Sequence, residues 1–204
     1  VTASGVMNRS PAVLGPDDDL ASAGQVMLDE RLSLLPVVDR SSVVGVLSMT
    51  DFVRLAVRVL REDAEAGACR VPVAAVMSSR PLVVARPRDS VSEVEQRMRR
   101  ERVRHVPVAD RDETVVGILS DRDVLAAMRS TTPHWAMKVA SVMTPAPVTT
   151  TAGADAVAAA TSMLRRAVGA LPVTEHERLV GMLTKTDFLA YLVTRVTGGR
   201  RAHD

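Results

Sequence analysis

A threefold internal repeat constrains this sequence more than any other of its features. Each copy opens on a Val-Met pair, at residues 6–7, 76–77 and 142–143. About 29 residues later each copy has a Pro-Val pair, and each copy closes on a glycine, two aliphatic residues, a hydroxyl residue and an aspartate, in GVLSMTD, GILSDRD and GMLTKTD. Because a recurring order at a near-constant spacing indicates a recurring structural unit, we expect three copies of one small fold.

The secondary structure of each copy follows from its apolar spacing. In the second copy, Ser90 and Glu93 have the pattern of a helix capping box. Val91, Val94 and Met98 then recur at the spacing of one helix face. Two short apolar runs joined by a polar turn predict an antiparallel hairpin, and a second helix follows each closing aspartate. Each copy is therefore predicted to be strand–helix–strand–strand–helix, which is a mixed α/β (α+β) fold.

The same helix start is predicted in the other two copies. Asp19 and Asp155 stand at the capping position. The equivalent apolar positions of the helix face are Leu20, Ala23 and Met27 in the first copy and Ala156, Ala159 and Met163 in the third. The three copies are predicted to span residues 1–60, 71–130 and 137–197.

A unit of about 60 residues buries so little apolar surface that its stability alone is marginal, so the copies are expected to pair. Three is an odd number for a fold that pairs. Two copies can pair within the chain, and the third then leaves an apolar sheet exposed. We therefore expect a homodimer in which the leftover copies meet across a two-fold axis. The sequence leaves open which two copies pair internally.

The order of Val-Met, amphipathic helix, Pro-Val and G-x-L-[ST]-x-x-D resembles the CBS domain, named for cystathionine beta-synthase. All three copies match, and GILSDRDV and GMLTKTDF are especially similar to the family pattern. The resemblance implies that the repeats pair sheet to sheet as Bateman modules. It also implies clefts between them that bind AMP, ADP or ATP, or sometimes S-adenosylmethionine. Such modules usually sense rather than catalyse.

The closing motif supplies groups suited to a nucleotide. In the second copy a strand ends near Ser120 and a helix begins after it, where backbone N–H groups and the helix dipole favour an anion. The carboxylate of Asp123 only accepts hydrogen bonds, so it can take both hydroxyls of a ribose. By resemblance, the hydroxyl contacts phosphate and the aspartate holds ribose. The equivalent pairs in the other copies are Ser48 with Asp51 and Thr184 with Asp187.

The same motif has a purely structural interpretation, because [ST]-x-x-[DE] before an apolar run is also close to a capping box. Every copy needs its helix capped, so recurrence alone does not separate the two interpretations. The second copy adds charge: Arg104 and His105 precede its Pro-Val pair, and Arg122 lies inside its motif. Guanidinium groups match phosphate geometry, so this copy best suits a nucleotide. Both arginines are equally consistent with exposed positions. His105 fits a partly buried packing residue better than a ligand, since no second histidine or cysteine is near it in sequence.

Composition excludes several other classes of protein. The formal net charge is only +2, so we expect no binding to nucleic acid or to an anionic membrane. The arginine-rich run near residue 100 is predicted to be a solvated helix face with ion pairs such as Glu93–Arg97 and Glu95–Arg99. No apolar stretch is long enough to span a membrane, and Cys69 is the only cysteine, which favours a cytoplasmic location. The four histidines are scattered, so no metal site is predicted.

No catalytic motif is present in the sequence, which has no nucleophile elbow, no Walker loop, no H-E-x-x-H and no paired cysteines. We therefore expect a non-catalytic sensor of adenine nucleotides, with no cofactor, that acts on a downstream partner the sequence does not identify. The alternatives are a structural or protein-interaction module without a ligand, and a module that binds S-adenosylmethionine.

Overall fold

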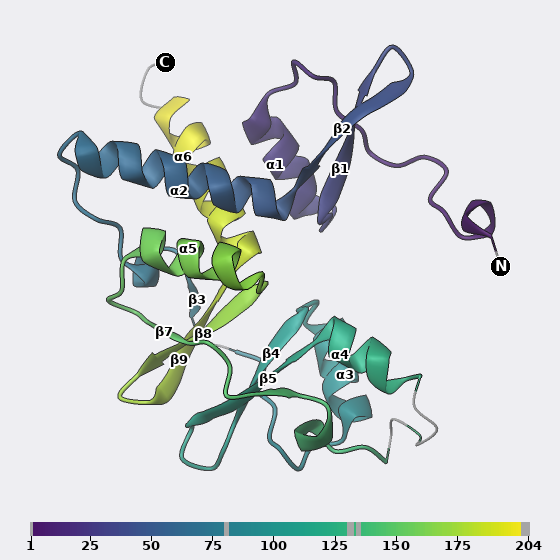
Figure 1. Ribbon diagram of the computed structural model, residues 1–204, viewed down its shortest axis with the longest axis vertical. Helices are drawn as coiled ribbons and strands as arrows, with labels where there is room; N and C mark the ends of the chain where they lie inside the picture. The colour runs from purple at the N-terminus through teal and green to yellow at the C-terminus, as the bar shows by residue number, and fades with distance from the viewer. Residues whose placement is uncertain (1, 80–81, 130–132, 134–135, 201–204) are drawn as a thin grey trace. The chain divides into compact units, whose positions relative to one another are not determined.

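The structure is a computed structural model that describes residues 2–79, 82–129, 133 and 136–200. Every repeat shows the predicted helix, hairpin and second helix, so the mixed α/β fold is confirmed (Figure 1). The chain divides into two units, which are described separately. One unit holds repeat one together with helix α6 (Lys185–Arg200), and the other holds repeats two and three within Leu60–Thr184.

Repeat one begins with an exposed helical turn. A parallel bridge between Leu14 and Val37 takes the place of the predicted first strand. Asp19 caps the first helix as predicted, by accepting the N–H of Ser22 at 3.0 Å. The elements of this repeat are η1 (Ala3–Gly5), α1 (Leu20–Asp29), β1 (Leu34–Asp39), β2 (Ser42–Ser48) and α2 (Met49–Glu65).

Repeats two and three carry the same kinds of element, and their predicted caps are confirmed. Ser90 and Glu93 form a capping box, and Asp155 accepts the N–H of Val157 at 2.8 Å. Repeat two comprises η2 (Val73–Ala75), β3 (Ser78–Ser79), α3 (Val91–Arg100), β4 (His105–Ala109), β5 (Val115–Ser120) and α4 (Asp121–Ala127). Repeat three comprises η3 (Val139–Ser141), β6 (Thr144–Pro145), β7 (Thr150–Thr151), α5 (Ala156–Arg166), β8 (Ala170–Glu175) and β9 (Arg178–Thr184), and leads into α6.

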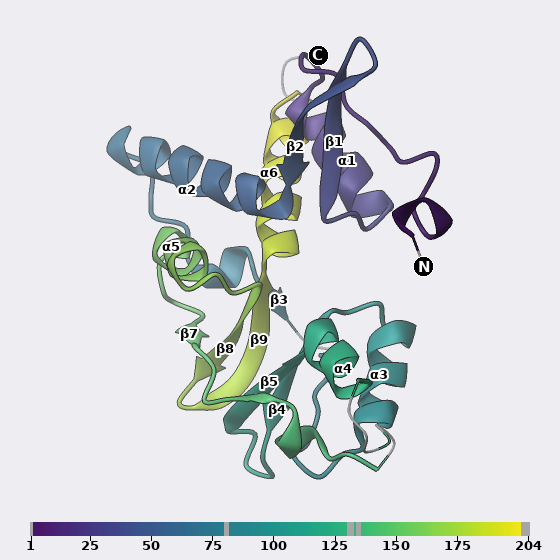
Figure 2. The ribbon, with the colours of Figure 1, turned by 45° about the vertical axis from the view of Figure 1, so that its right-hand side comes forward.

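Repeats two and three pair by exchanging the short strands that follow their Val-Met pairs. Strand β3 of repeat two adds antiparallel to β9 of repeat three, with Ser78 opposite Met182 (Figure 2). Strand β6 of repeat three adds to β5 of repeat two, with Thr144 opposite Ile118. The two sheets run β4-β5-β6 and β3-β9-β8-β7, so each ends on a strand from the other repeat. The structure thus identifies the internal pair, and the exchange is a feature that the sequence did not indicate.

Each exchange seats a methionine over the glycine of the other repeat's closing motif. The sulfur of Met77 lies 2.8 Å from the position that a Cβ of Gly181 would take. The sulfur of Met143 occupies the corresponding place over Gly117. A Cβ would also crowd a backbone carbonyl of the exchanged strand, at 3.0 Å from Ser78 O for Gly181 and 3.2 Å from Thr144 O for Gly117. Glycine at both positions therefore allows the close approach that joins the two repeats.

The helical turns before the exchanged strands are also bound to the other repeat. The N–H of Val73 in η2 donates to the carbonyl of Ala154 at 2.8 Å, and the N–H of Val139 in η3 donates to the carbonyl of Asp89 at 3.0 Å. Both acceptors stand one residue before a helix cap, in the loops that lead into α5 and α3. The two repeats therefore make equivalent contacts in both directions.

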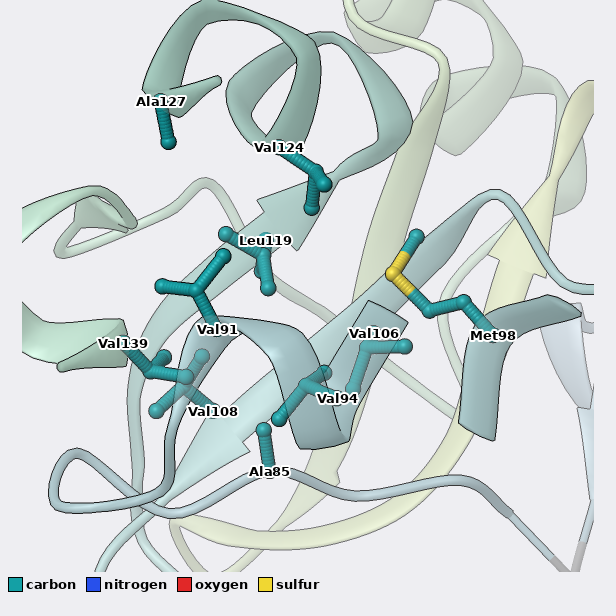
Figure 3. Packing of buried hydrophobic residues seen from close by; sticks show 10 residues of the cluster. All are labelled: Ala85, Val91, Val94, Met98, Val106, Val108, Leu119, Val124, Ala127 and Val139. Atoms are coloured by element: carbon teal, nitrogen blue, oxygen red, sulfur yellow. The ribbon is translucent and has the colours of Figure 1, made fainter. Parts of the chain in front are cut away.

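The core of repeat two lies between its hairpin and its two helices (Figure 3). The predicted apolar face of α3 is confirmed, since Val91, Val94 and Met98 are all buried there. Val139 of repeat three belongs to the same cluster, so the paired repeat contributes to this core. The other members of the cluster are Ala85, Val106, Val108, Leu119, Val124 and Ala127.

In the other unit, helix α1 of repeat one packs against α6. A Cβ on Gly24 would stand 2.7 Å from Val193 Cγ2 and 2.9 Å from Leu189 Cδ1, so the glycine lets the two helices approach closely. Lys185 Nζ also donates to Thr50 Oγ1 at 2.9 Å, which joins the starts of α6 and α2. The helix that follows repeat three in sequence thus packs on repeat one.

The predicted apolar face of α1 is buried at Ala23 and Met27 but not at Leu20. Its side chain is 47% exposed, whereas the equivalent Val91 and Ala156 have no exposed surface. The exchanged segments account for this difference, because the N–H of Val91 donates to the carbonyl of Met137 from the paired repeat at 3.0 Å. Repeat one receives no such segment from the described part of the chain.

We call the surface of Gly181 on which Met77 packs, and its equivalent at Gly117, the methionine seat. Substituting Gly181 tests this seat. Gly181→Ala should lower the free energy of unfolding by about 1–3 kcal/mol, because the added methyl group would displace Met77 from β9. Gly153→Ala is the matched control, since no atom lies within 4 Å of the position its Cβ would take. Urea denaturation followed by circular dichroism measures both variants. Equal stability of wild type and Gly181→Ala would contradict this role of the seat.

Candidate functional site

The closing motif of repeat two lies where β5 ends and α4 begins. Ser120 is the last residue of β5 and the N-cap of α4, and it stands opposite His105 in the hairpin. Asp121, Arg122 and Asp123 form the first turn of α4. The hairpin register and the short helix therefore bring the predicted site residues of repeat two to one end of the sheet.

Ser120 and Asp123 form a complete capping box. The backbone N–H and the hydroxyl of Ser120 donate to Oδ2 of Asp123 at 2.8 and 2.7 Å. The N–H of Asp123 donates back to the hydroxyl at 3.3 Å. The structural interpretation of the motif is therefore confirmed in repeat two. The box does not use the whole carboxylate, because Oδ1 of Asp123 has no hydrogen-bond partner among the described residues.

Repeat one forms only half of this box, because no described hydrogen bond runs from the N–H of Asp51 back to Ser48. The backbone N–H and hydroxyl of Ser48 donate to Oδ2 of Asp51 at 2.9 and 2.6 Å. Arg54, one helical turn further on, donates to Oδ1 of Asp51 at 2.7 Å. The Ser48 hydrogen bonds, with the charge and hydrogen bond of Arg54, lower the pKa of Asp51 despite its partial burial. Both oxygens of Asp51 are thus already engaged. The three-residue spacing between Asp51 and Arg54 is the sequence signal that could have indicated this pair.

The motif of repeat three spans the two units. Thr184 is the last residue of β9, and Asp187 lies in the first turn of α6. Both residues are half-buried. Their assignment to a ligand site stays a prediction.

His105 is the part of the site that touches the paired repeat. Its ring atoms Cε1 and Nε2 each lie 2.9 Å from the position that a Cβ of Gly169 would take, so the backbone of repeat three closes against the ring. Burial lowers the pKa of His105 below its ordinary value, with Asp121 opposing the shift and Arg104 among the groups that add to it. The imidazole is therefore neutral at neutral pH and sits half-buried at the junction of the two repeats.

Arg104 and Arg122 supply the positive charge of this region. Both are exposed, and both are close enough to His105 for their charges to act on it. The first turn of α4 carries Asp121 and Asp123, which offset the positive end of the short helix dipole. An anion at this end of the sheet would therefore depend on the two arginines.

The arginine-rich face of α3 differs in one respect from its prediction. Arg99 pairs with Glu95 at 2.6 Å as expected, but Arg97 pairs with Asp89 at the same distance. The carboxylate of Glu93 instead reaches back to the N–H of Ser90 in the capping box, at 3.3 Å.

Other binding features lie away from the predicted site residues. One open hollow follows the exposed face of α3, and another lies beside the hairpin turns of repeats two and three. Within the described ranges, no group of three His, Cys, Asp or Glu side chains is placed to hold a metal ion. The described helices also include none that is long and apolar enough to cross a membrane. The second hollow is lined by Ser79, Glu113, Glu175, His176, Arg178, Leu179 and Val180.

Sequence comparison places the three repeats in one family. The sequence model of the CBS domain matches residues 3–58, 73–130 and 139–194. Inosine-5'-monophosphate dehydrogenase of Mycobacterium bovis is 33% identical over 124 residues, which are 58% of this chain and 22% of that enzyme. The chain thus spans about a fifth of the length of this relative. The uncharacterized protein MJ1225 of Methanocaldococcus jannaschii is 24% identical over 91% of this chain and 69% of its own length.

Two solved structures extend the comparison. The crystal structure of MJ1225 aligns with a TM-score of 0.77 at 21% identity, over 93% of this chain and 70% of that one, which supports the fold. CBSX2 of Arabidopsis thaliana, solved in complex with AMP, aligns with a TM-score of 0.55 at 28% identity. That alignment covers 61% of this chain and 98% of CBSX2.

The burial of His105 predicts how stability changes with pH. Because its pKa is depressed in the folded protein, the unfolded chain takes up a proton first, near its ordinary pKa of 6.5. Stability should therefore fall as the pH drops from there toward the folded-state pKa. His105→Gln should flatten this dependence, with His176→Gln at an exposed turn as the control. Urea denaturation between about pH 5 and 7 measures the slope, and an unchanged slope in His105→Gln would contradict the assignment.

Proposed function

The chain belongs to the CBS domain family, and from this premise we propose that it is a non-catalytic regulatory protein that binds adenosine-containing nucleotides between repeats two and three. The observation that carries the proposal is Oδ1 of Asp123, which no described residue engages and which lies beside His105 and the two exposed arginines. AMP is the first ligand to test, because CBSX2, at 28% identity, was solved with AMP. ADP and ATP are the related candidates.

Asp123 is the proposed ribose ligand. Its Oδ2 holds the cap of α4, while Oδ1 is left to accept from the two adjacent hydroxyls of a ribose. Each such bond is charge-assisted and contributes about 1.5–3 kcal/mol. One carboxylate can therefore cap the helix and bind the ligand at the same time.

Arg104 and Arg122 are the proposed phosphate ligands. Their guanidinium groups are exposed and match the geometry of a phosphate. The hydroxyl of Ser120 donates to Asp123 in the structure, so a phosphate contact from it would require that hydrogen to turn. His105, neutral and half-buried, would line the site and not carry charge.

The other two motifs have different proposed roles. In repeat one, Arg54 occupies the oxygen of Asp51 that a ribose would need, so Ser48 and Asp51 have a structural role at the start of α2. Thr184 and Asp187 remain candidates for a further ligand site.

Two other functions are alternatives to the binding of an adenine nucleotide. A structural module without a ligand is favoured by the complete capping box of Ser120 and Asp123, which needs no nucleotide. S-adenosylmethionine is the alternative ligand, since it also offers a ribose. The similarity to the mycobacterial dehydrogenase covers 22% of that enzyme, so we carry no activity over from it. The cytoplasmic location stays a prediction.

We also propose that the protein acts as a homodimer formed through repeat one, and that it signals to an effector by differential affinity of the effector for the free and the bound forms. The exposed apolar surface of repeat one supports the dimer.

Substituting Asp123 tests the nucleotide site. Asp123→Asn keeps an oxygen for the cap but removes the charge, so the dissociation constant of AMP should rise about tenfold to a hundredfold. Asp51→Asn is the matched control in repeat one and should leave AMP binding unchanged, because Arg54 already occupies that carboxylate. Isothermal titration calorimetry measures both variants, and unchanged affinity in Asp123→Asn would overturn the ribose assignment.

A thermal-shift screen with AMP, ADP, ATP and S-adenosylmethionine tests the wider proposal. A ligand that binds only the folded protein stabilises it by about 2.7 kcal/mol at a hundredfold excess over its dissociation constant. No shift with any of the four at millimolar concentration would favour the structural module.

A further inference from the structure

Repeat one has both features that join repeats two and three, a glycine seat and a segment with a methionine. Within the described residues neither makes an exchange contact. Gly45 occupies the position of Gly181 in its motif, yet no atom lies within 4 Å of where its Cβ would stand. Met7 occupies the position of Met77 and is 53% exposed. In the part of the chain that the structure describes, the methionine seat at Gly45 is therefore empty, and Met7 packs on no such seat.

The surface around Gly45 is exposed where its equivalents are covered. Val46 is 58% exposed, whereas the equivalent Met182, which lies under β3, is 5% exposed. Leu20 differs from Val91 in the same way. The other large apolar residues of repeat one that are exposed are Val6, Val13, Leu34, Val43 and Val44.

The N-terminal segment already has the shape of an exchanged segment. The N–H of Met7 donates to the carbonyl of Ala3 at 2.8 Å, as the N–H of Met77 donates to that of Val73 at the same distance. No residue of η1 is buried. Figure 1 shows this turn at the end of an extended segment that leads away from β1 and β2.

The other places that accept such a segment are filled. The edge of β5 is paired with β6, and the edge of β9 is paired with β3. The edge of β2 beside Gly45 is the place that is still open, because within the described residues β2 pairs with β1 alone. One repeat that offers both a segment and a vacant seat is self-complementary under a two-fold axis.

We propose that two copies of this chain exchange residues 2–9, so that the segment of each copy adds to β2 of the other. By the register of β3 on β9, Asn8 of one copy would stand opposite Val46 of the other, and Arg9 opposite Gly45. Met7 then fills the seat over Gly45. By the bonds of η2 and η3, the N–H of Ala3 donates to the carbonyl of Asp18 in the other copy.

This interface gives residues and a register to the homodimer of the proposed function, and it does not depend on nucleotide binding. It also places Leu34 at the two-fold axis, because Leu34 is the equivalent of His105, which lies against repeat three. The contact at the two-fold axis of the dimer would thus be apolar, whereas the equivalent position in the pair of repeats two and three holds His105. Each copy would cover the apolar strand that the other leaves open.

The test is the mass of the full chain in solution, measured without nucleotide by sedimentation velocity. Wild type should sediment as a dimer. Gly45→Lys and Met7→Glu should each shift the protein to the mass of one chain, because each variant damages both seats of the dimer. Leu125→Glu, at an exposed apolar position in α4, is the matched control and should stay dimeric. Circular dichroism checks that every variant is folded.

Mixing the two variants distinguishes exchange from any other apolar contact. A mixed dimer has one intact seat, with Met7 over Gly45, and one seat in which Glu at position 7 faces Lys at position 45. Equimolar Gly45→Lys and Met7→Glu should therefore recover the dimer mass. A monomeric wild type, a dimer unaffected by both variants, or a mixture that stays monomeric would overturn the exchange. The AMP titration of Asp123→Asn tests the nucleotide site in an independent experiment. The nucleotide proposal and the exchange proposal can therefore fail independently.

Discussion

The exchange of the segments that contain the Val-Met pairs holds repeats two and three together, and much of the structure depends on it. A repeat of about 60 residues has a small core and is only marginally stable alone. The exchanged segment adds a strand to the neighbouring sheet, covers the start of its first helix and seats a methionine on its glycine. Where repeat one lacks an exchanged segment, the equivalent surface is exposed.

The candidate site depends on the same pairing. The backbone at Gly169 of repeat three closes against His105, and the burial that results keeps the imidazole neutral. The difference between the aspartates, in contrast, is local. Asp51 and Asp123 both accept from the serine three residues before them, but Arg54 takes the second oxygen of Asp51, and no described residue takes that of Asp123. The side chain of Arg54, one helical turn after Asp51, thus makes two copies of one motif differ in their free carboxylate oxygen.

The local features could be predicted because they rest on near neighbours in the chain. The capping box of Ser90 and the buried face of α3 follow from spacings of three to seven residues, and both are confirmed. Arg97 was assigned the wrong partner, because Glu93 is used by the cap and Asp89 comes close only when the loop folds. Leu20 was assigned to the core because its helix pattern matches that of α3. What covers such a position is a segment from another repeat, and spacing along one helix carries no information about it.

By itself, the sequence determined the repeat, the family, the order of elements and the chemistry of the closing motif, because each is written in residues close together along the chain. Only the tertiary structure decided that repeats two and three pair, that their first strands cross over, and that α6 packs on repeat one. These outcomes depend on which apolar surfaces meet. Three similar repeats present similar surfaces, so a local pattern cannot distinguish between their pairings, and the contacts between distant segments decide.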